Sequence, residues 1–229
     1  MTRSQVEHVI RVAGMISDDD DIVVIGSQSI LGSFPDAPGE LLVSREADVY
    51  PRTYPERAEL IDGSIGEGSP FEQAYGYYAD GVGPETTILP TGWQERLVVV
   101  FGPNTRLVRG WCLEAHDLAI AKLVAGREKD LDYVGVMRRY EMVSGEVLEA
   151  RLGVTPMEPV VRALVAGRIG RLFGHLNRRG RPDVFADVRS QLLKVFQVPR
   201  VKELGTAFEK ALADDCIVDS AAGSATFGG

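Results

Sequence analysis

The chain has 229 residues, of which 45% are hydrophobic, so it can fold around one sizeable core or two small ones. A formal net charge of −8 favours solubility and disfavours indiscriminate nucleic-acid binding, although local basic patches can still bind phosphates. No apolar run reaches the roughly 20 residues of a membrane span, and the N-terminus lacks a signal-peptide pattern. We therefore expect a cytoplasmic protein, with Cys112 and Cys216 as free thiols.

The first predicted elements are an amphipathic helix over residues 5–16 and an apolar strand over 22–25. The acidic run 18–21 lies between them. We interpret it as a solvated loop, because consecutive carboxylates do not converge on one ion without an unusual loop. The strand ends at Gly26 and Ser27, and a short helical segment is predicted to follow.

A second strand is predicted to lead from 41–43 into Glu46 and Asp48. Residues i and i+2 of a strand share a face, so the two carboxylates project together and repel each other. Mg²⁺ would remove this conflict, because it prefers one or two protein carboxylates combined with substrate phosphates. Gly26 and Ser27 could present backbone N–H groups and a hydroxyl to such phosphates. A Gly-Ser pair is also a common strand-to-helix turn, and Glu-x-Asp also marks solvated strand faces.

The middle of the chain predicts three further strands, over 86–89, 96–101 and 107–113, and hence a five-stranded mixed sheet. Glu95 stands at the head of one of them. The Gly-rich stretch 62–69 lacks the lysine and Ser/Thr of a P-loop, so we interpret it as a connection. Aromatic residues at 71–78 could stack on a base, but their spacing is more typical of packing.

Two consecutive helices are then predicted, the first capped by Asp117 and ended by Gly126, the second starting near residue 128. Lys122 lies among apolar residues of the first helix, a setting that suits phosphate binding. His116 is either a general base or, more in keeping with its place, a helix-entry histidine bonded to backbone.

The order of strand, Gly-Ser turn, helix, strand and acid-x-acid resembles the nucleotidyltransferase superfamily. The later Lys122, Arg127, Lys129 and Asp130 resemble the signature of abortive-infection toxins of the AbiEii kind and the related MenT transferases. The resemblance covers residues 23–140. It departs from the family in one acid, Glu46, where aspartate is usual, and in a gap from Ser27 to Glu46 that is longer than in the most compact relatives.

The resemblance implies a divalent metal, Mg²⁺ or Mn²⁺, held by Glu46 and Asp48, and a nucleoside triphosphate as substrate. It further implies that Lys122 helps to bind the nucleotide and that Asp130 completes the active site. Glu95 is the nearest strand carboxylate that could serve as an additional acid, because a third one is not obvious.

Beyond residue 140 the pattern changes to helices, over 143–152, 156–165, 169–176, 182–196 and 201–212. We therefore predict a core over 1–140, a helical lobe over 141–215 and a flexible tail over 216–229. Arginines of the lobe suit contacts with RNA phosphates or, alternatively, a solvated face or an acidic partner. The candidates are Arg171, Arg178, Arg179 and Arg181.

The expected fold is α/β, with a mixed sheet and a C-terminal helical lobe. The leading functional hypothesis is a toxin-like enzyme that transfers a nucleoside monophosphate from an NTP to RNA, with tRNA as one option, or to protein, and that has an antitoxin partner. The alternative is a nucleotidyltransferase-like binding or regulatory module without catalysis. A third option is an unrelated α/β protein that does not bind NTP.

Overall fold

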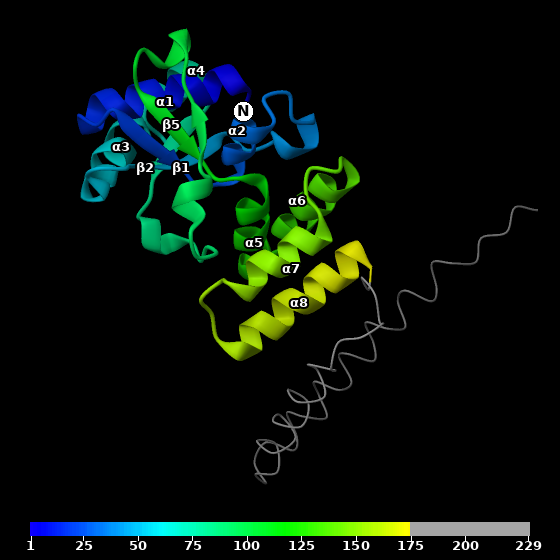
Figure 1. Ribbon diagram of the computed structural model, residues 1–229. Coiled ribbons are helices and arrows are strands. Elements are labelled where there is room, and N and C mark those ends of the chain that lie inside the picture. The colour runs from blue at the N-terminus through cyan, green and yellow to red at the C-terminus, as the bar shows by residue number, and fades with distance from the viewer. Residues whose placement is uncertain (175–229) are drawn as a thin grey trace, which may run out of the picture. The chain divides into compact units, whose positions relative to one another are not determined.

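A five-stranded mixed sheet organises the molecule, as a computed structural model that describes residues 1–174 shows. The strand order is β3-β2-β1-β5-β4. The strands are β1 Asp21–Val24, β2 Glu46–Pro51, β3 Tyr78–Gly81, β4 Val98–Val100 and β5 Arg109–Cys112. The α/β class and the mixed sheet predicted from the sequence are confirmed (Figure 1).

Both parallel and antiparallel pairs build this sheet. β1 runs antiparallel to β2 and parallel to β5, β2 runs parallel to β3, and β4 runs antiparallel to β5. The β1–β2 pairing brings the end of β1 to the beginning of β2, where the Ile25 N–H donates to the Asp48 carbonyl at 3.0 Å. The Gly26–Ser27 turn therefore lies next to the acid pair.

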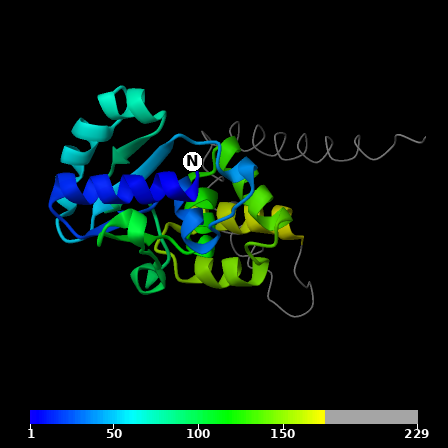
Figure 2. The same cartoon turned by 90° about the horizontal axis from the view of Figure 1, so that it is seen from above.

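Helices cover one face of the sheet. α1 contacts β1, β2, β3 and β5, α3 packs on β2 and β3, and α2 packs on β4 and β5. Figure 2 shows α1 lying across the strands. The helices of this part are α1 Arg3–Ser17, α2 Ile30–Ser33, α3 Ala58–Ile65 and α4 Pro70–Tyr75. Since alternate residues point to opposite faces, Glu46, Asp48 and Asp80 are left on the face that these helices do not cover.

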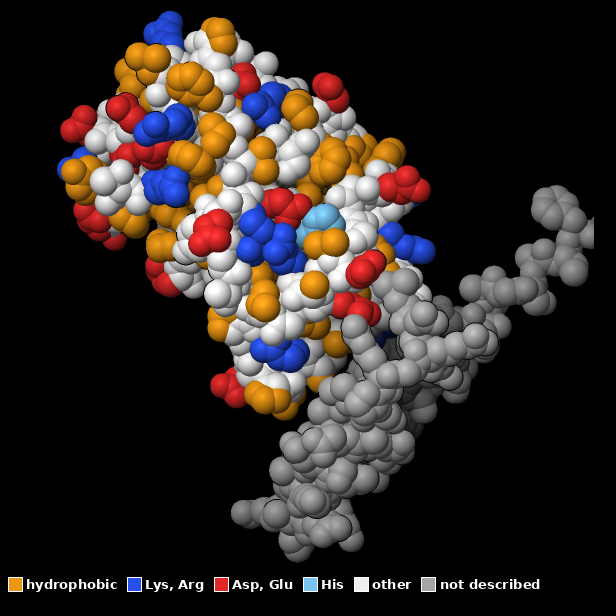
Figure 3. Space-filling view, viewed as in Figure 1, with side chains coloured by type: hydrophobic (Ala, Val, Ile, Leu, Met, Phe, Trp, Pro, Cys, Tyr) orange, Lys and Arg blue, Asp and Glu red, His pale blue; other side chains and the backbone are white. Residues whose placement is uncertain are grey.

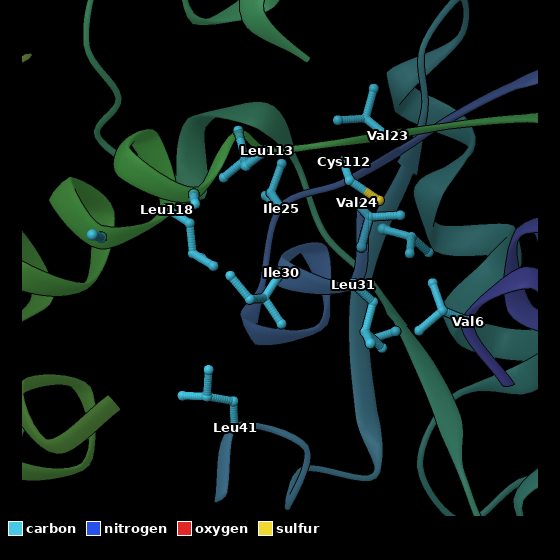
Figure 4. Packing of buried hydrophobic residues seen from close by; sticks show 14 of the residues in the cluster. Val6, Val23, Val24, Ile25, Ile30, Leu31, Leu41, Cys112, Leu113 and Leu118 are labelled. Carbon is cyan, nitrogen blue, oxygen red and sulfur yellow. The ribbon is translucent and has the colours of Figure 1, made fainter. Parts of the chain in front are cut away.

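The hydrophobic core lies between the sheet and its helices. Side chains of β1 and of the α2 region meet there with Cys112 of β5 and residues at the start of the helix that follows it (Figure 4). Val24, Ile30 and Leu118 are at most 1% exposed. This packing fixes the end of β1 against that helix, and so sets where the Gly26–Ser27 turn lies.

Four helices gather at the other end of the described chain (Figure 1). They are α5 Ala115–Ala125, α6 Glu128–Arg139, α7 Gly145–Gly153 and α8 Pro159–Phe173. α5 ends at Gly126 in the left-handed conformation, φ 64°, as predicted, but its N-cap is Glu114 and not Asp117. The helices predicted over 156–165 and 169–176 form the single helix α8, which continues through Gly167. The Arg168 guanidinium donates to the Leu123 carbonyl and so holds α8 on the last turn of α5.

Two strand predictions are wrong. Residues 86–89 form no strand, because the chain turns through the 3₁₀ segment Pro84–Thr86 and no ladder partner follows. The fifth strand is instead β3, which none of the strand predictions covers and of which only Tyr78 belongs to the aromatic segment 71–78. Its Asp and Gly are residues that strands usually lack, but Gly81 allows the close approach of the α3 backbone. Residues 41–43 also precede β2 without joining it.

No helix among residues 1–174 is long and apolar enough to cross a membrane. The predicted helices over 182–196 and 201–212, the tail over 216–229 and Cys216 lie outside the described residues. The predicted boundary at residue 140 stays a prediction.

Candidate metal and nucleotide site

Three carboxylates meet on the uncovered face of the sheet. The β2–β3 register places Tyr78 beside Glu46 and Asp80 beside Asp48. One oxygen each from Glu46, Asp48 and Asp80 can be chosen so that the three lie within 4.8 Å of one another. An all-oxygen set of this kind suits a hard divalent cation such as Mg²⁺ or Mn²⁺.

Asp80 is the acid that the sequence analysis missed. The sequence signal was the polar–apolar–polar alternation in Tyr78-Ala79-Asp80, which is typical of a strand. In the structure Ala79 is buried, and Tyr78 and Asp80 are partly exposed. Glu95, the sequence candidate for an additional acid, lies exposed on the 3₁₀ segment Trp93–Arg96 and does not belong to the three-carboxylate group.

No described Lys or Arg side chain forms a salt bridge with these three carboxylates, and the nearby Lys122 offsets their charge only in part. Burial raises the pKa of the Asp48 carboxyl to about 7, and the nearby Glu46 and Asp80 add to the rise. Burial, a hydrogen bond with Asp62 and the charge of Glu46 also raise the pKa of Asp80. Like charges forced together in this way are the condition that a bound cation relieves. The residues present therefore fit a divalent metal.

Gly26 makes room for the acid group. A Cβ atom built at this position would overlap the Asp48 carboxylate. The turn can thus come close to the acids only because residue 26 has no side chain. The hydroxyl of Ser27, the next residue, points to a different partner, the ammonium of Lys122.

A second charged group lies beside the turn, and in it the carboxylate of Asp130 pairs with two cations, Lys122 and Arg127. Lys122 Nζ donates to Ser27 Oγ at 2.9 Å and to Asp130 Oδ1 at 3.2 Å. Arg127 Nε donates to Asp130 Oδ2 at 2.6 Å. The Asp130 side chain is 1% exposed and that of Lys122 is 11% exposed, whereas Arg127 is 64% exposed.

The pKa shifts follow from this pairing. Burial lowers the pKa of Lys122, although Asp130 and Asp48 oppose the shift. Burial alone would favour neutral Asp130, but hydrogen bonds from Arg127 and Lys122 hold its pKa below the ordinary value. Asp130 therefore favours the charged form of Lys122 and opposes the effect of burial on that lysine.

The Lys122 group and two of the three acids, Glu46 and Asp48, line one cleft of about 870 Å³. Gly26, Ser27, Glu46 and Asp48 form one part of its lining, and the α5–α6 residues Lys122, Arg127, Lys129, Asp130 and Tyr133 form another. The exposed apolar side chains of Val43 and Ile88 line it as well. A cleft of this size accommodates a nucleotide.

The segment that carries Ile88 is anchored to α5 by a buried ion pair. Arg96 Nε donates to Asp117 Oδ2 at 2.8 Å, and Arg151 of α7 lies 3.3 Å from the same carboxylate. Asp117, predicted as a helix cap, thus ties three elements together.

Figure 3 shows Lys or Arg side chains at the surface over α5 and α7, next to acidic and histidine side chains.

The remaining sequence candidates have packing contacts. His116 Nδ1 pairs with Glu114 Oε1 at 2.7 Å, and its Nε2 accepts the Ser144 N–H at 3.1 Å, so it is a histidine bonded to backbone at a helix entry. Of the arginine candidates, Arg171 is exposed on α8. The other three, Arg178, Arg179 and Arg181, lie outside the described residues.

The comparison with protein families finds a match to residues 4–160, and that family is described as nucleotidyltransferases of unknown function (DUF6036). No curated protein and no solved structure matches the chain. The matched residues include all three carboxylates of the acid group, the Gly26–Ser27 turn and Lys122.

Proposed function

The chain belongs to this nucleotidyltransferase family, and on that premise we propose that it catalyses metal-dependent transfer of a nucleoside monophosphate from an NTP to an acceptor. The acceptor oxygen would bond to the α-phosphorus and lose its proton to solvent. The bond from that phosphorus to the α–β bridging oxygen would break, its electron pair would stay on that oxygen, and pyrophosphate would leave. The observation that carries the proposal is that carboxylates of a group without a salt-bridge partner and a lysine paired with Asp130 line the same cleft.

Glu46, Asp48 and Asp80 would hold Mg²⁺ or Mn²⁺. When bound, such an ion would neutralise phosphate charge and acidify the attacking hydroxyl. Gly26 lets the chain approach the phosphates closely, and Ser27 would contribute its hydroxyl and backbone N–H. These two residues would bind the triphosphate.

On the other side of the cleft, the Lys122 ammonium would stabilise the negative charge that develops on the leaving phosphates. Asp130 would act through Lys122, because both of its oxygens are engaged by cations. Asp130 also lies apart from the group of three carboxylates formed by Glu46, Asp48 and Asp80, which supports a role separate from metal binding.

For the acceptor we propose RNA, with tRNA as the first candidate, and a toxin-like role with an antitoxin partner. This part rests on the resemblance in the Lys122 to Asp130 motif and on the arginines of the C-terminal part. Within the described residues, Arg162 and Arg168 donate to backbone carbonyls, so Arg171 is the exposed member of the series. A protein acceptor is the other outcome of the same experiment.

The test is incubation of the protein with each α-labelled NTP, Mg²⁺ and total RNA, followed by separation of labelled RNA from labelled protein. Wild type should label RNA, Asp48→Asn should not, and label should vanish when the metal is chelated. Asp36→Asn, a change at an exposed loop aspartate, is the matched control and should label as wild type does.

Equal labelling by wild type and Asp48→Asn would contradict the assignment of the site. Absence of label with metal-dependent NTP binding intact would favour the non-catalytic module. The lack of an obvious third strand acid in the sequence favours that alternative, and Asp80 beside Glu46 and Asp48 supports the catalytic proposal instead.

A further inference from the structure

Tyr133 of α6 contacts both halves of the phosphate site. Its hydroxyl donates to the Ser27 carbonyl oxygen at 2.7 Å. Its ring lies under the Lys122 ammonium, with Nζ 4.3 Å from the ring centroid. The side chain lines the cleft and is 9% exposed, so these contacts are largely shielded from water.

The sequence places this tyrosine by helical spacing. Tyr133 follows Asp130 by three residues on α6, so the two side chains lie on one face of the helix. That face is turned toward Lys122 of α5. One ammonium thus meets a carboxylate, a hydroxyl and an aromatic face, from Asp130, Ser27 and Tyr133.

We propose that Tyr133 is a positioning residue for the triphosphate, which holds the Gly26–Ser27 turn through its hydroxyl and aims Lys122 through its ring. The inference rests on the proposed function, because it assumes that the turn and the lysine bind phosphates. Tyr133 is not part of the sequence motifs, and it couples the two proposed phosphate contacts, the Gly26–Ser27 turn and Lys122.

Two physical effects support the role. A lysine side chain has many rotamers, and an aromatic face beneath the ammonium restricts them while leaving one N–H direction for a phosphate. The hydroxyl adds a second hydrogen bond to the Ser27 carbonyl, which also accepts the Ile30 N–H. The turn and the lysine are thereby ordered before the nucleotide arrives, which lowers the ordering cost of binding.

The test separates the hydroxyl from the ring. Binding of each NTP with Mg²⁺ is measured by calorimetry for wild type, Tyr133→Phe and Tyr133→Leu, and the best-bound NTP is then used. Loss of the hydroxyl in Tyr133→Phe should weaken binding by about 2- to 10-fold. Loss of the ring as well, in Tyr133→Leu, should weaken it by a further 3- to 10-fold or so.

A double-mutant cycle distinguishes positioning from general loss of packing. In a Lys122→Met background the ring has no ammonium to hold, so Tyr133→Leu and Tyr133→Phe should weaken binding equally. Tyr77→Phe is the matched control, because Tyr77 is also a buried tyrosine, 7% exposed, whose hydroxyl is bonded to His8 outside the cleft. It should leave NTP affinity within twofold of wild type, and thermal unfolding checks that each variant is folded.

The outcomes also separate this inference from the proposed function. NTP binding by wild type that is unchanged in Tyr133→Leu, or a difference between Leu and Phe that persists without Lys122, would overturn the positioning role alone. No NTP binding by wild type under any condition would overturn the proposed function and this inference with it.

Discussion

The two charged groups of the cleft are built in opposite ways. The acid group is carried by two strands, and its three carboxylates face one another without a cation among the described side chains that pairs with them. The Lys122 group is carried by two helices, and each of its charges has an opposite partner. Burial and the charge of Glu46 raise the pKa of Asp48, whereas Arg127 and Lys122 hold the pKa of Asp130 below its ordinary value in spite of its burial.

This contrast indicates what each group needs from a ligand. The acid group gains free energy when a cation enters, because its electrostatic cost is then removed. The lysine group is already satisfied and serves as a fixed donor, whose remaining N–H can meet a phosphate without rearrangement. The predictions below test the contrast, from the largest expected effect to the smallest.

The largest effect is expected at Asp80. Asp80→Asn removes one of three charges that would hold the metal, so transfer should fall by at least about 100-fold. Glu95→Gln is the comparison, since Glu95 lies exposed outside the acid group, and its activity should match wild type. Initial rates at saturating Mg²⁺ and NTP measure both. A loss in Glu95→Gln with activity retained in Asp80→Asn would reverse the assignment of the third acid.

The next effect tests the close approach at the turn. Gly26→Ala forces a methyl group against the Asp48 carboxylate, so the turn or the acid must move. A displacement of about 1 Å at a reacting centre can cost on the order of 100-fold in rate. Gly63 lies on α3, and a Cβ atom added there meets no atom within 4 Å, so Gly63→Ala should keep full activity. Rates and metal-dependent thermal shifts are measured for both variants. Normal activity in Gly26→Ala would show that the reaction does not need the close approach of the turn to the Asp48 carboxylate.

A smaller effect is expected at Asp130. Asp130→Asn removes the carboxylate that raises the pKa of Lys122 against its burial, so the lysine loses its proton at a lower pH. We expect a loss of about tenfold near neutral pH and an alkaline limb of the pH–rate profile displaced to lower pH. Glu128→Gln, an exposed acid in the same first helical turn, is the control. An unmoved alkaline limb would mean that Asp130 does not act through Lys122.

The smallest effect is on stability. The pKa of Asp48 is raised from 3.8 to about 7 in the folded protein, so ionisation of this carboxyl destabilises the fold. The destabilisation is small near pH 4, grows as the pH rises toward 7, and is complete above pH 7. Asp48→Asn should therefore raise the melting temperature of the metal-free protein at pH 8, by roughly 2–8 °C, and leave it nearly unchanged near pH 4. Scanning calorimetry at both values measures this difference. Equal shifts at the two values would exclude an electrostatic cause.

Much of the site could be predicted from the sequence because its parts are local. Glu46 and Asp48 share a strand face by simple alternation, and Gly126 ends α5 where the helical pattern stops. Lys122 and Asp130 flank a short turn, so their helices had to meet. These features depend on neighbours in the chain.

The features that were missed depend on pairing between distant segments. Asp80 joins the acids only through the parallel register of β2 and β3, which a helix-containing connection separates in the chain. Asp117 looked like a helix cap, yet it is an ion-pair partner of Arg96 and Arg151 from two other elements. Helix α8 continues through Gly167 because packing outweighs the low helix propensity of glycine.

The parallel pairing of β2 and β3 has a consequence for how sequences of this kind can change. The connection over 52–77 runs outside the sheet, so insertions or deletions there leave the β2–β3 register intact. Deletion of Ala79 alone would instead turn Asp80 toward the helix-covered face. We therefore expect related chains to differ in length across this connection while keeping a polar-small-acid triplet at the start of β3.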